Sequence, residues 1–190
     1  MTKTPAKKTA APKTDAPKKV APKTGTPKNG AAEKAVAGPQ VGDKAPAFAL
    51  PTDGGGKVSL ADLKGKPVVL YFYPKDDTSG CTSEAIDFSG LKAKFDKLGA
   101  VVIGCSRDSV AAHDKFKTKH KLKVILAADE SGKATESYGV WGEKSLYGRK
   151  YMGIERATFL IAPSGKVAAV WRKVKVAGHA EAVLQAIQAL

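Results

Sequence analysis

Cysteine is scarce in this chain, whose 190 residues include only Cys81 and Cys105. Two cysteines are too few for the disulfide-dense scaffold of a small secreted domain, and too few for a zinc site of four thiolates. Long hydrophobic runs are missing as well. No stretch approaches the ~18 apolar residues of a membrane span, and no apolar signal segment follows Met1. The composition therefore favours a soluble protein with reduced thiols, and we expect a cytoplasmic location with no membrane contact.

The first forty residues lack aromatic side chains and arginine altogether. They contain nine lysines, two acidic residues and six of the eleven prolines. An organelle presequence is Arg-rich and amphipathic, so this composition argues against one. Such a segment also buries too little apolar surface to offset the entropy of ordering its backbone. We therefore predict a disordered basic tail over residues 1–40 and one folded domain over residues 41–190.

The tail carries half of the formal net charge of the chain, +7 of +14. From Ala11 it repeats a pentapeptide four times, as APKTD, APKKV, APKTG and TPKNG. Lys-Pro-Ala repeats resemble the tails of histone-H1-like and bacterial nucleoid proteins, and lysines can neutralise phosphates in a salt-sensitive way. Two interpretations stay open: a solubilising extension, or weak nonspecific nucleic-acid binding that would make the chain a nucleic-acid-associated protein with a secondary folded domain.

The pattern of hydrophobic residues after position 40 indicates an α/β domain. Parallel-type buried strands alternate with helices, and a hairpin and a last helix follow, which describes a central mixed β-sheet flanked by helices. Turn residues 51–56 suggest a short hairpin before the first buried strand. We expect strands at 48–50, 57–60, 68–73, 101–105, 124–127, 158–161 and 167–171, and helices at 81–99, 109–120 and 180–190.

Cys81 is placed at the start of a predicted helix, directly after the strand 68–73. Helix N-termini carry a partial positive charge and free N–H donors, which favour thiolate over thiol. Cys81 also lies seven residues before Phe88 on the apolar stripe, so its thiol should sit at the edge of the core. A lone cysteine is more often a small buried hydrophobe. A reactive thiolate is the competing hypothesis.

The residues around Cys81 resemble the peroxidatic motif of the peroxiredoxins: Pro74, four residues later Thr78, and three residues later Cys81. Further segments, VGDKAP from Val41, KGKPVVLYFYPKD, YGVWGEKS and GIERATFLI, resemble the bacterioferritin comigratory protein or Q-type subfamily, in order, over residues 41–190. The resemblance implies a thioredoxin-like fold. It also implies thiol-dependent reduction of hydrogen peroxide and organic hydroperoxides through a cysteine sulfenic acid.

The resemblance also implies roles for individual residues. Cys81 would be the peroxidatic nucleophile, Thr78 would hydrogen-bond the thiolate and the peroxide, and Pro74 would shield the pocket from water. Arg156 would fold back over the thiolate and stabilise the negative charge of the leaving oxygen. Glu84 is a supporting candidate, expected in the first helical turn as a partner of the helix dipole, with a bond to Arg156 as the second alternative.

The chain departs from many relatives at the position five residues after Cys81, where Ile86 replaces a resolving cysteine. Cys105 is the only other thiol, and its place in a buried strand suits either a core residue or an atypical resolving cysteine. We therefore favour a one-cysteine mechanism, in which thioredoxin, glutaredoxin or glutathione reduces the sulfenic acid. We expect a monomer or a weak dimer.

Metal and cofactor sites are not indicated. The chain has three histidines, and the spacing of His113 and His120 does not suit two metal ligands on one helix face. We predict that these two and His179 lie on the surface. The glycines at 54–56 complete neither a phosphate loop nor a dinucleotide-binding fingerprint. We therefore expect neither a cofactor nor a metal ion.

Overall fold

The computed structural model describes residues 38–146 and 148–190. The predicted tail therefore lies outside the described residues except for its last three positions. Two of these, Gly38 and Pro39, are buried. The next residue, Gln40, donates its backbone N–H to a carboxylate oxygen of Asp43 at 2.8 Å. Residues 38–40 thus pack with the folded domain.

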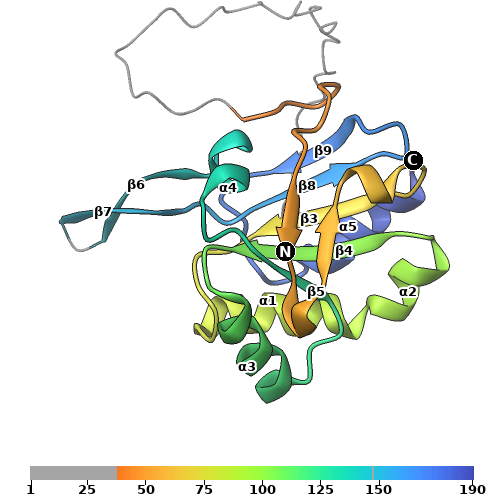
Figure 1. The fold of residues 1–190 in the computed structure, drawn as a ribbon. Helices are drawn as coiled ribbons and strands as arrows, with labels where there is room; N and C mark the ends of the chain where they lie inside the picture. The colour runs from red at the N-terminus through yellow and green to blue at the C-terminus, as the bar shows by residue number, and fades with distance from the viewer. Residues whose placement is uncertain (1–37, 147) are drawn as a thin grey trace, which may run out of the picture. The chain divides into compact units, whose positions relative to one another are not determined.

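A five-stranded mixed sheet forms the centre of the domain, in the order β5-β4-β3-β8-β9 (Figure 1). The central strand β3 (Val68–Phe72) pairs in parallel with β4 (Val101–Ser106), which pairs in parallel with β5 (Ile125–Ala128). On its other side β3 pairs antiparallel with β8 (Ala157–Ile161), and β8 pairs antiparallel with β9 (Val167–Trp171). The predicted mixed sheet is confirmed.

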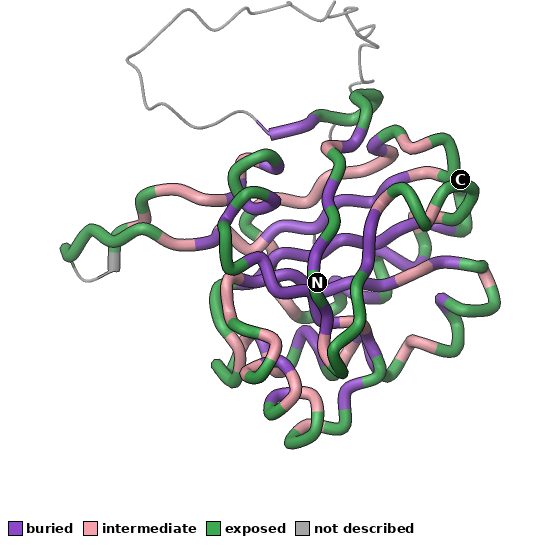
Figure 2. The backbone as a smooth tube through the Cα atoms, in the orientation of Figure 1, coloured by how far each residue is buried: buried purple, intermediate pink, exposed green. Residues whose placement is uncertain are grey.

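Strand β3 is fully buried because side chains on both of its faces pack into hydrophobic cores (Figure 2). Val69, Tyr71 and the following Tyr73 belong to one cluster, whereas Leu70 and Phe72 belong to the other. This alternation follows from the two-residue period of a strand, and it explains why the sequence of β3 reads as a continuous apolar run.

Helices cover one face of the sheet: α1 (Ser79–Gly90), α2 (Lys92–Lys97), α3 (Val110–His120) and α5 (His179–Gln188) each contribute buried side chains to the cluster that contains Tyr71. The predicted single helix over 81–99 is thus two helices, separated at Leu91. Gly99 follows α2 with a φ of 67°, a left-handed conformation that glycine adopts without strain.

The opposite face of the sheet is covered by shorter elements. These are the predicted hairpin of β1 (Ala49–Pro51) and β2 (Lys57–Ser59), the short helix α4 (Lys133–Ser137), and the single-turn 3-10 helix η2 (Ala61–Leu63). A second 3-10 helix, η1 (Asp53–Gly55), lies between β1 and β2 and contacts β5 and α3. Buried residues of the β1–β2 hairpin and of α4 join the cluster that contains Phe72.

A second hairpin, which the sequence patterns did not predict, joins β6 (Trp141–Leu146) to β7 (Arg149–Ile154). It forms a separate two-stranded sheet that extends away from the central strands (Figure 1). Most side chains of β7 are exposed, so the hairpin lacks the buried apolar alternation that marks the other strands. No helix in the described part of the chain is long and apolar enough to span a membrane.

The prediction that the three histidines lie on the surface is wrong for two of them. His113 is fully buried and His179 is 6% exposed. Each ring finds a polar partner inside the protein: Nδ1 of His113 lies 2.7 Å from a carboxylate oxygen of Asp76, and Nε2 of His179 lies 2.8 Å from the hydroxyl of Thr158. Because these partners come from distant segments, the local sequence did not reveal them.

Candidate active site

Cys81 is the third residue of α1, immediately beyond the loop that follows β3. Its thiol is free, and the residue is 1% exposed. The side chain packs in the same cluster as Ala85 and Phe88 of α1, as the apolar stripe predicted. The sulfur is therefore held at the positive end of a twelve-residue helix and is shielded from bulk water.

Arg156 reaches this thiol from the short connection between β7 and β8. Its Nη2 lies 3.3 Å from the sulfur of Cys81, and its Nη1 donates to a carboxylate oxygen of Glu84. The guanidinium passes close to Gly80, where an added Cβ would lie 3.1 Å from Nη2. Glycine therefore gives Arg156 room to reach the sulfur, a function that sequence patterns alone did not assign to it.

Glu84 is 1% exposed and lies in the second turn of α1. The expected place in the first turn, as a dipole partner, is thus wrong, and the second alternative, a bond to Arg156, is what the structure contains. Burial raises the pKa of Glu84 from 4.5 to about 7, although the neighbouring Arg156 acts in the opposite direction. Its second oxygen, Oε1, has no hydrogen-bond partner among the described residues.

Thr78 and Pro74 lie in the loop between β3 and α1. Thr78 is the N-cap residue of α1, and its carbonyl oxygen accepts the backbone N–H of Thr82. Its hydroxyl donates to the carbonyl of Lys75 at 3.2 Å, so the implied bond to the thiolate requires a rotation of this side chain. Pro74 lies at the opposite end of the loop and lines an open groove.

The groove beside Pro74 has a volume of about 330 Å³ and lies between this loop and the β6–β7 hairpin. Its walls include Arg107, Trp141, Lys144 and Met152. The guanidinium of Arg107 stacks over the ring of Trp141, 3.5 Å from the ring centroid. Trp141 and Lys144 belong to the YGVWGEKS segment noted above, but only the fold shows that they line the approach to Pro74.

Cys105 lies on β4, where it pairs in register with Phe72 of β3. It belongs to the hydrophobic cluster on one face of the sheet, whereas Cys81 belongs to the cluster on the other face. Burial raises the pKa of Cys105 well above its usual range. The structure therefore places the two thiols on opposite sides of the central sheet and leaves Cys105 poorly suited to ionise.

A metal centre does not form among residues 38–146 and 148–190, because no group of three histidine, cysteine, aspartate or glutamate side chains converges there. What the arrangement does provide is a buried sulfur at a helix N-terminus, an arginine within hydrogen-bond distance of it, and a carboxylate that holds the arginine. A sulfur nucleophile can react there, and the arginine can stabilise an anionic leaving group.

Comparisons with known proteins identify the family of this chain. Residues 41–170 match the model of the AhpC/TSA family. The putative peroxiredoxin bcp of Coxiella burnetii is 54% identical over 145 residues, which cover 76% of this chain and 96% of the relative. Peroxiredoxin Bcp of Bacillus subtilis is 49% identical over 149 residues, which cover 78% of this chain and 95% of the relative.

A solved structure gives the same result for the fold. The bacterioferritin comigratory protein of Xanthomonas campestris, studied for its alkyl peroxide reduction activity, superposes with a TM-score of 0.71 at 46% identity, over 75% of this chain and 90% of that protein. The domain therefore has the thioredoxin-like fold that the resemblance implied. A matching family model, two relatives near half identity and a shared fold lead to one conclusion: this chain belongs to the AhpC/TSA family, as a peroxiredoxin of the Bcp or Q type.

Proposed function

We propose that this protein is a thiol-dependent peroxidase that reduces hydrogen peroxide and organic hydroperoxides at Cys81. The observation that carries the proposal is the 3.3 Å contact between the sulfur of Cys81 and Nη2 of Arg156, at the N-terminus of α1. Membership of the peroxiredoxins supports the same activity, and the Xanthomonas campestris protein was studied for alkyl peroxide reduction.

The first step is a displacement at oxygen. The Cys81 thiolate attacks one peroxide oxygen, a sulfur–oxygen bond forms and the oxygen–oxygen bond breaks. Sulfur is oxidised to a sulfenic acid, and the other oxygen leaves with the electron pair and takes up a proton, as water or an alcohol. Negative charge develops on that leaving oxygen, and the guanidinium of Arg156 beside the sulfur stabilises it.

Glu84, Thr78 and Pro74 assist the step in this proposal. Glu84 fixes the guanidinium through its bond to Nη1 of Arg156, so that Nη2 stays directed at the sulfur. Thr78, once its hydroxyl turns away from the Lys75 carbonyl, donates to the thiolate or the peroxide. Pro74 has no backbone N–H group, so it leaves no free backbone donor at the edge of the site that could bind water.

The second step returns the sulfenic acid to a thiol without help from Cys105. An external thiol attacks the sulfur of the sulfenic acid, which releases water and leaves a mixed disulfide, and a second thiol displaces Cys81 from that disulfide. We assign this task to thioredoxin, glutaredoxin or glutathione. The supporting observation is that the two cysteines occupy separate cores on opposite faces of the sheet.

Two matched cysteine variants test the proposal. Cys81→Ser should abolish peroxide consumption, whereas Cys105→Ser should retain it with each effective reductant. Consumption that persists in Cys81→Ser contradicts the peroxidase assignment. Non-reducing gels after one equivalent of peroxide test the one-cysteine mechanism, because a disulfide that disappears in Cys105→Ser would identify Cys105 as the resolving thiol. Parallel assays with the thioredoxin, glutaredoxin and glutathione systems identify the reductant.

The proposal also includes the cellular location and the oligomeric state of the protein. Each of these reductants operates in a reducing compartment, so we place the protein in the cytoplasm, as a monomer or weak dimer. Cell fractionation and sedimentation velocity check the two statements. The nucleic-acid interpretation depends on residues 1–40, nearly all of which lie outside the described residues, and none of the comparisons supports it.

A further inference from the structure

The loop that carries Pro74 and Thr78 also contains Asp76, whose carboxylate is tied to a buried polar cluster outside the site described above. The hydroxyl of Tyr73 donates to Oδ1 of Asp76 at 2.7 Å. Nδ1 of His113, on α3, lies 2.7 Å from Oδ2 of the same carboxylate. The side chain of His113 is completely buried and that of Asp76 is 7% exposed. Asp76 thus links the loop to α3 inside the protein.

The same loop has two further contacts. The backbone N–H of Asp76 donates to a carboxylate oxygen of Asp108 at 2.9 Å. Asp77 adopts a left-handed conformation with a φ of 59°, which aspartate tolerates better than most residues other than glycine. Lys119 and His120 of α3 bind its carboxylate. The Asp77 side chain is 46% exposed, and ion pairs of exposed groups contribute little to stability. The bond between His113 and Asp76 is the buried connection to α3.

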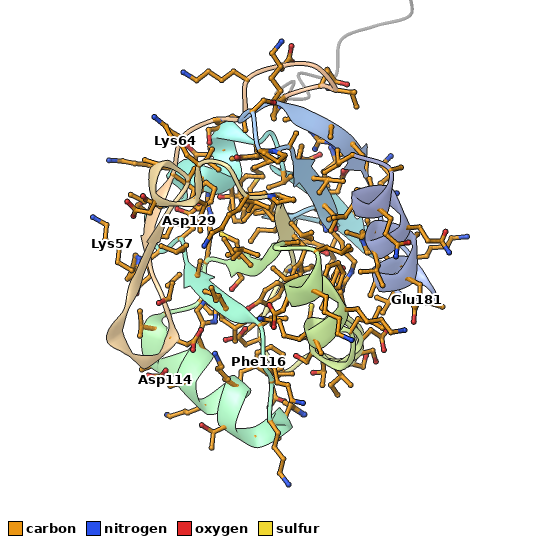
Figure 3. All side chains as sticks on the ribbon, turned by 90° about the vertical axis from the view of Figure 1, so that its right-hand side faces the viewer. Lys57, Lys64, Asp114, Phe116, Asp129 and Glu181 are labelled. Atoms are coloured by element: carbon orange, nitrogen blue, oxygen red, sulfur yellow. The ribbon has the colours of Figure 1, made fainter. Side chains whose placement is uncertain are left out.

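Helix α3 is itself firmly anchored. Two of its residues, Phe116 and Asp114, contact other parts of the protein (Figure 3). Phe116 is 2% exposed and packs in the cluster that contains Tyr71, and Asp114 accepts the backbone N–H of Gly54 at 2.7 Å. These contacts fix the position of the His113 ring, and the carboxylate of Asp76 is bound to that ring.

The position of this loop decides whether the sulfur meets the arginine. Asp76 lies two residues before Thr78, which caps the helix that carries Cys81. Arg156 comes from the connection between β7 and β8, beside the strand β8 that pairs with β3, and its guanidinium is bound by Glu84 of α1. A shift of the loop would move the N-terminus of α1, and Cys81 with it, relative to the backbone of Arg156. A misplacement of about 1 Å at a reacting centre can cost about a hundredfold in rate.

We propose that His113 is a positioning residue for the peroxidatic site: its Nδ1–H donates to Asp76 and holds the loop where the Cys81 sulfur meets Arg156. Nε2 of His113 has no hydrogen-bond partner among the described residues. Nδ1 also lies 3.5 Å from the hydroxyl of Tyr73, which itself donates to Asp76, so the carboxylate of Asp76 is the acceptor that faces Nδ1. This inference rests on the proposed peroxidase activity of Cys81.

The test compares His113→Leu with His113→Asn, because leucine removes the donor and the asparagine amide nitrogen keeps one near the position of Nδ1. Stopped-flow mixing of the full-length reduced protein with hydrogen peroxide gives the rate constant for Cys81 oxidation. Alkylation of Cys81 by iodoacetamide, followed by mass spectrometry, reports how much of the thiolate is present and reactive. His120→Leu, which removes the ring that binds the exposed Asp77 carboxylate, is the matched control.

We expect His113→Leu to lower the peroxide rate constant about tenfold to a hundredfold, and the alkylation rate by a clearly smaller factor. His113→Asn should recover most of the loss, and His120→Leu should stay within about twofold. An unchanged peroxide rate in His113→Leu overturns the inference. So does an equal loss in His113→Asn or His120→Leu, or a proportional fall in alkylation.

A milder variant covers the case in which His113→Leu does not fold. Tyr73→Phe removes only the hydroxyl that donates to the Asp76 carboxylate bound by His113. It should lower the peroxide rate constant by a larger factor than the alkylation rate, and an unchanged peroxide rate overturns the inference. The proposed function fails in a different way, namely if the unmodified protein shows no oxidation of Cys81 by peroxide at all. The two failures are therefore distinguishable.

Discussion

Replacing Glu84 by glutamine removes a buried ionisable group and nearly preserves its shape. Burial raises the pKa of this carboxyl group from 4.5 to about 7 in the folded protein. At about 1.4 kcal/mol per pKa unit, the folded state disfavours the charged form by about 3 kcal/mol relative to the unfolded chain. The stability that protonated Glu84 contributes is therefore complete below pH 4.5 and is lost as the pH rises through about 7.

Urea unfolding of both proteins between pH ~5 and ~8 measures this effect, because other titrating groups cancel in the difference. We expect the free energy of unfolding of the unmodified protein, minus that of Glu84→Gln, to fall by about 2.5 kcal/mol across this range. A difference that stays constant would refute the reasoning. A difference that rises with pH would show that the ion pair with Arg156 outweighs burial and lowers the pKa.

Three other substitutions have defined outcomes. Arg156→Ala should slow the reaction of Cys81 with peroxide by more than its loss of thiolate explains, because full ionisation of an ordinary thiol gains at most ~30-fold in rate at pH 7. Ultraviolet absorbance measures the thiolate concentration, and equal rates per thiolate in the two proteins would contradict this prediction. Burial lowers the pKa of His179 to about 4, so the stability that the neutral ring contributes above pH 6.5 is lost as the pH falls through about 4. Urea unfolding at acid pH should show no such loss in His179→Gln. Tyr71→Phe removes a buried hydroxyl that has no partner among the described residues, so it should raise the free energy of unfolding by ~1 kcal/mol, and a decrease would indicate a bound water.

The sequence predicted the sheet because each of its strands is a short apolar run. The continuous pattern of β3 and β4 reflects burial on both faces, and a periodic pattern of this kind needs no knowledge of distant contacts. The β6–β7 hairpin escaped prediction for the opposite reason. Its residues are largely exposed and pair only with each other, so they carry no apolar alternation.

The residues of the candidate site likewise divide into those that the sequence predicted and those that depend on distant contacts. Motif spacing identified Cys81, Thr78 and Pro74, because they lie within eight residues of one another. The environments of Glu84 and His113 could not be predicted in this way. The carboxylate of Glu84 meets an arginine 72 positions away, and the ring of His113 meets a carboxylate 37 positions away. Sequence patterns suggested an exposed position for His113 and a helix-dipole role for Glu84, with the bond to Arg156 only as the second alternative, and tertiary contacts decided both.

The arginine that meets the sulfur lies 75 residues further along the chain. During synthesis, the helix that carries the thiol is complete long before β8 exists, so an unfinished chain presents a cysteine without its arginine. The centre is therefore complete only once β8 has been synthesised and has paired with β3. The rate of the reaction with peroxide can accordingly serve as a direct measure of how much of the population has reached the native arrangement.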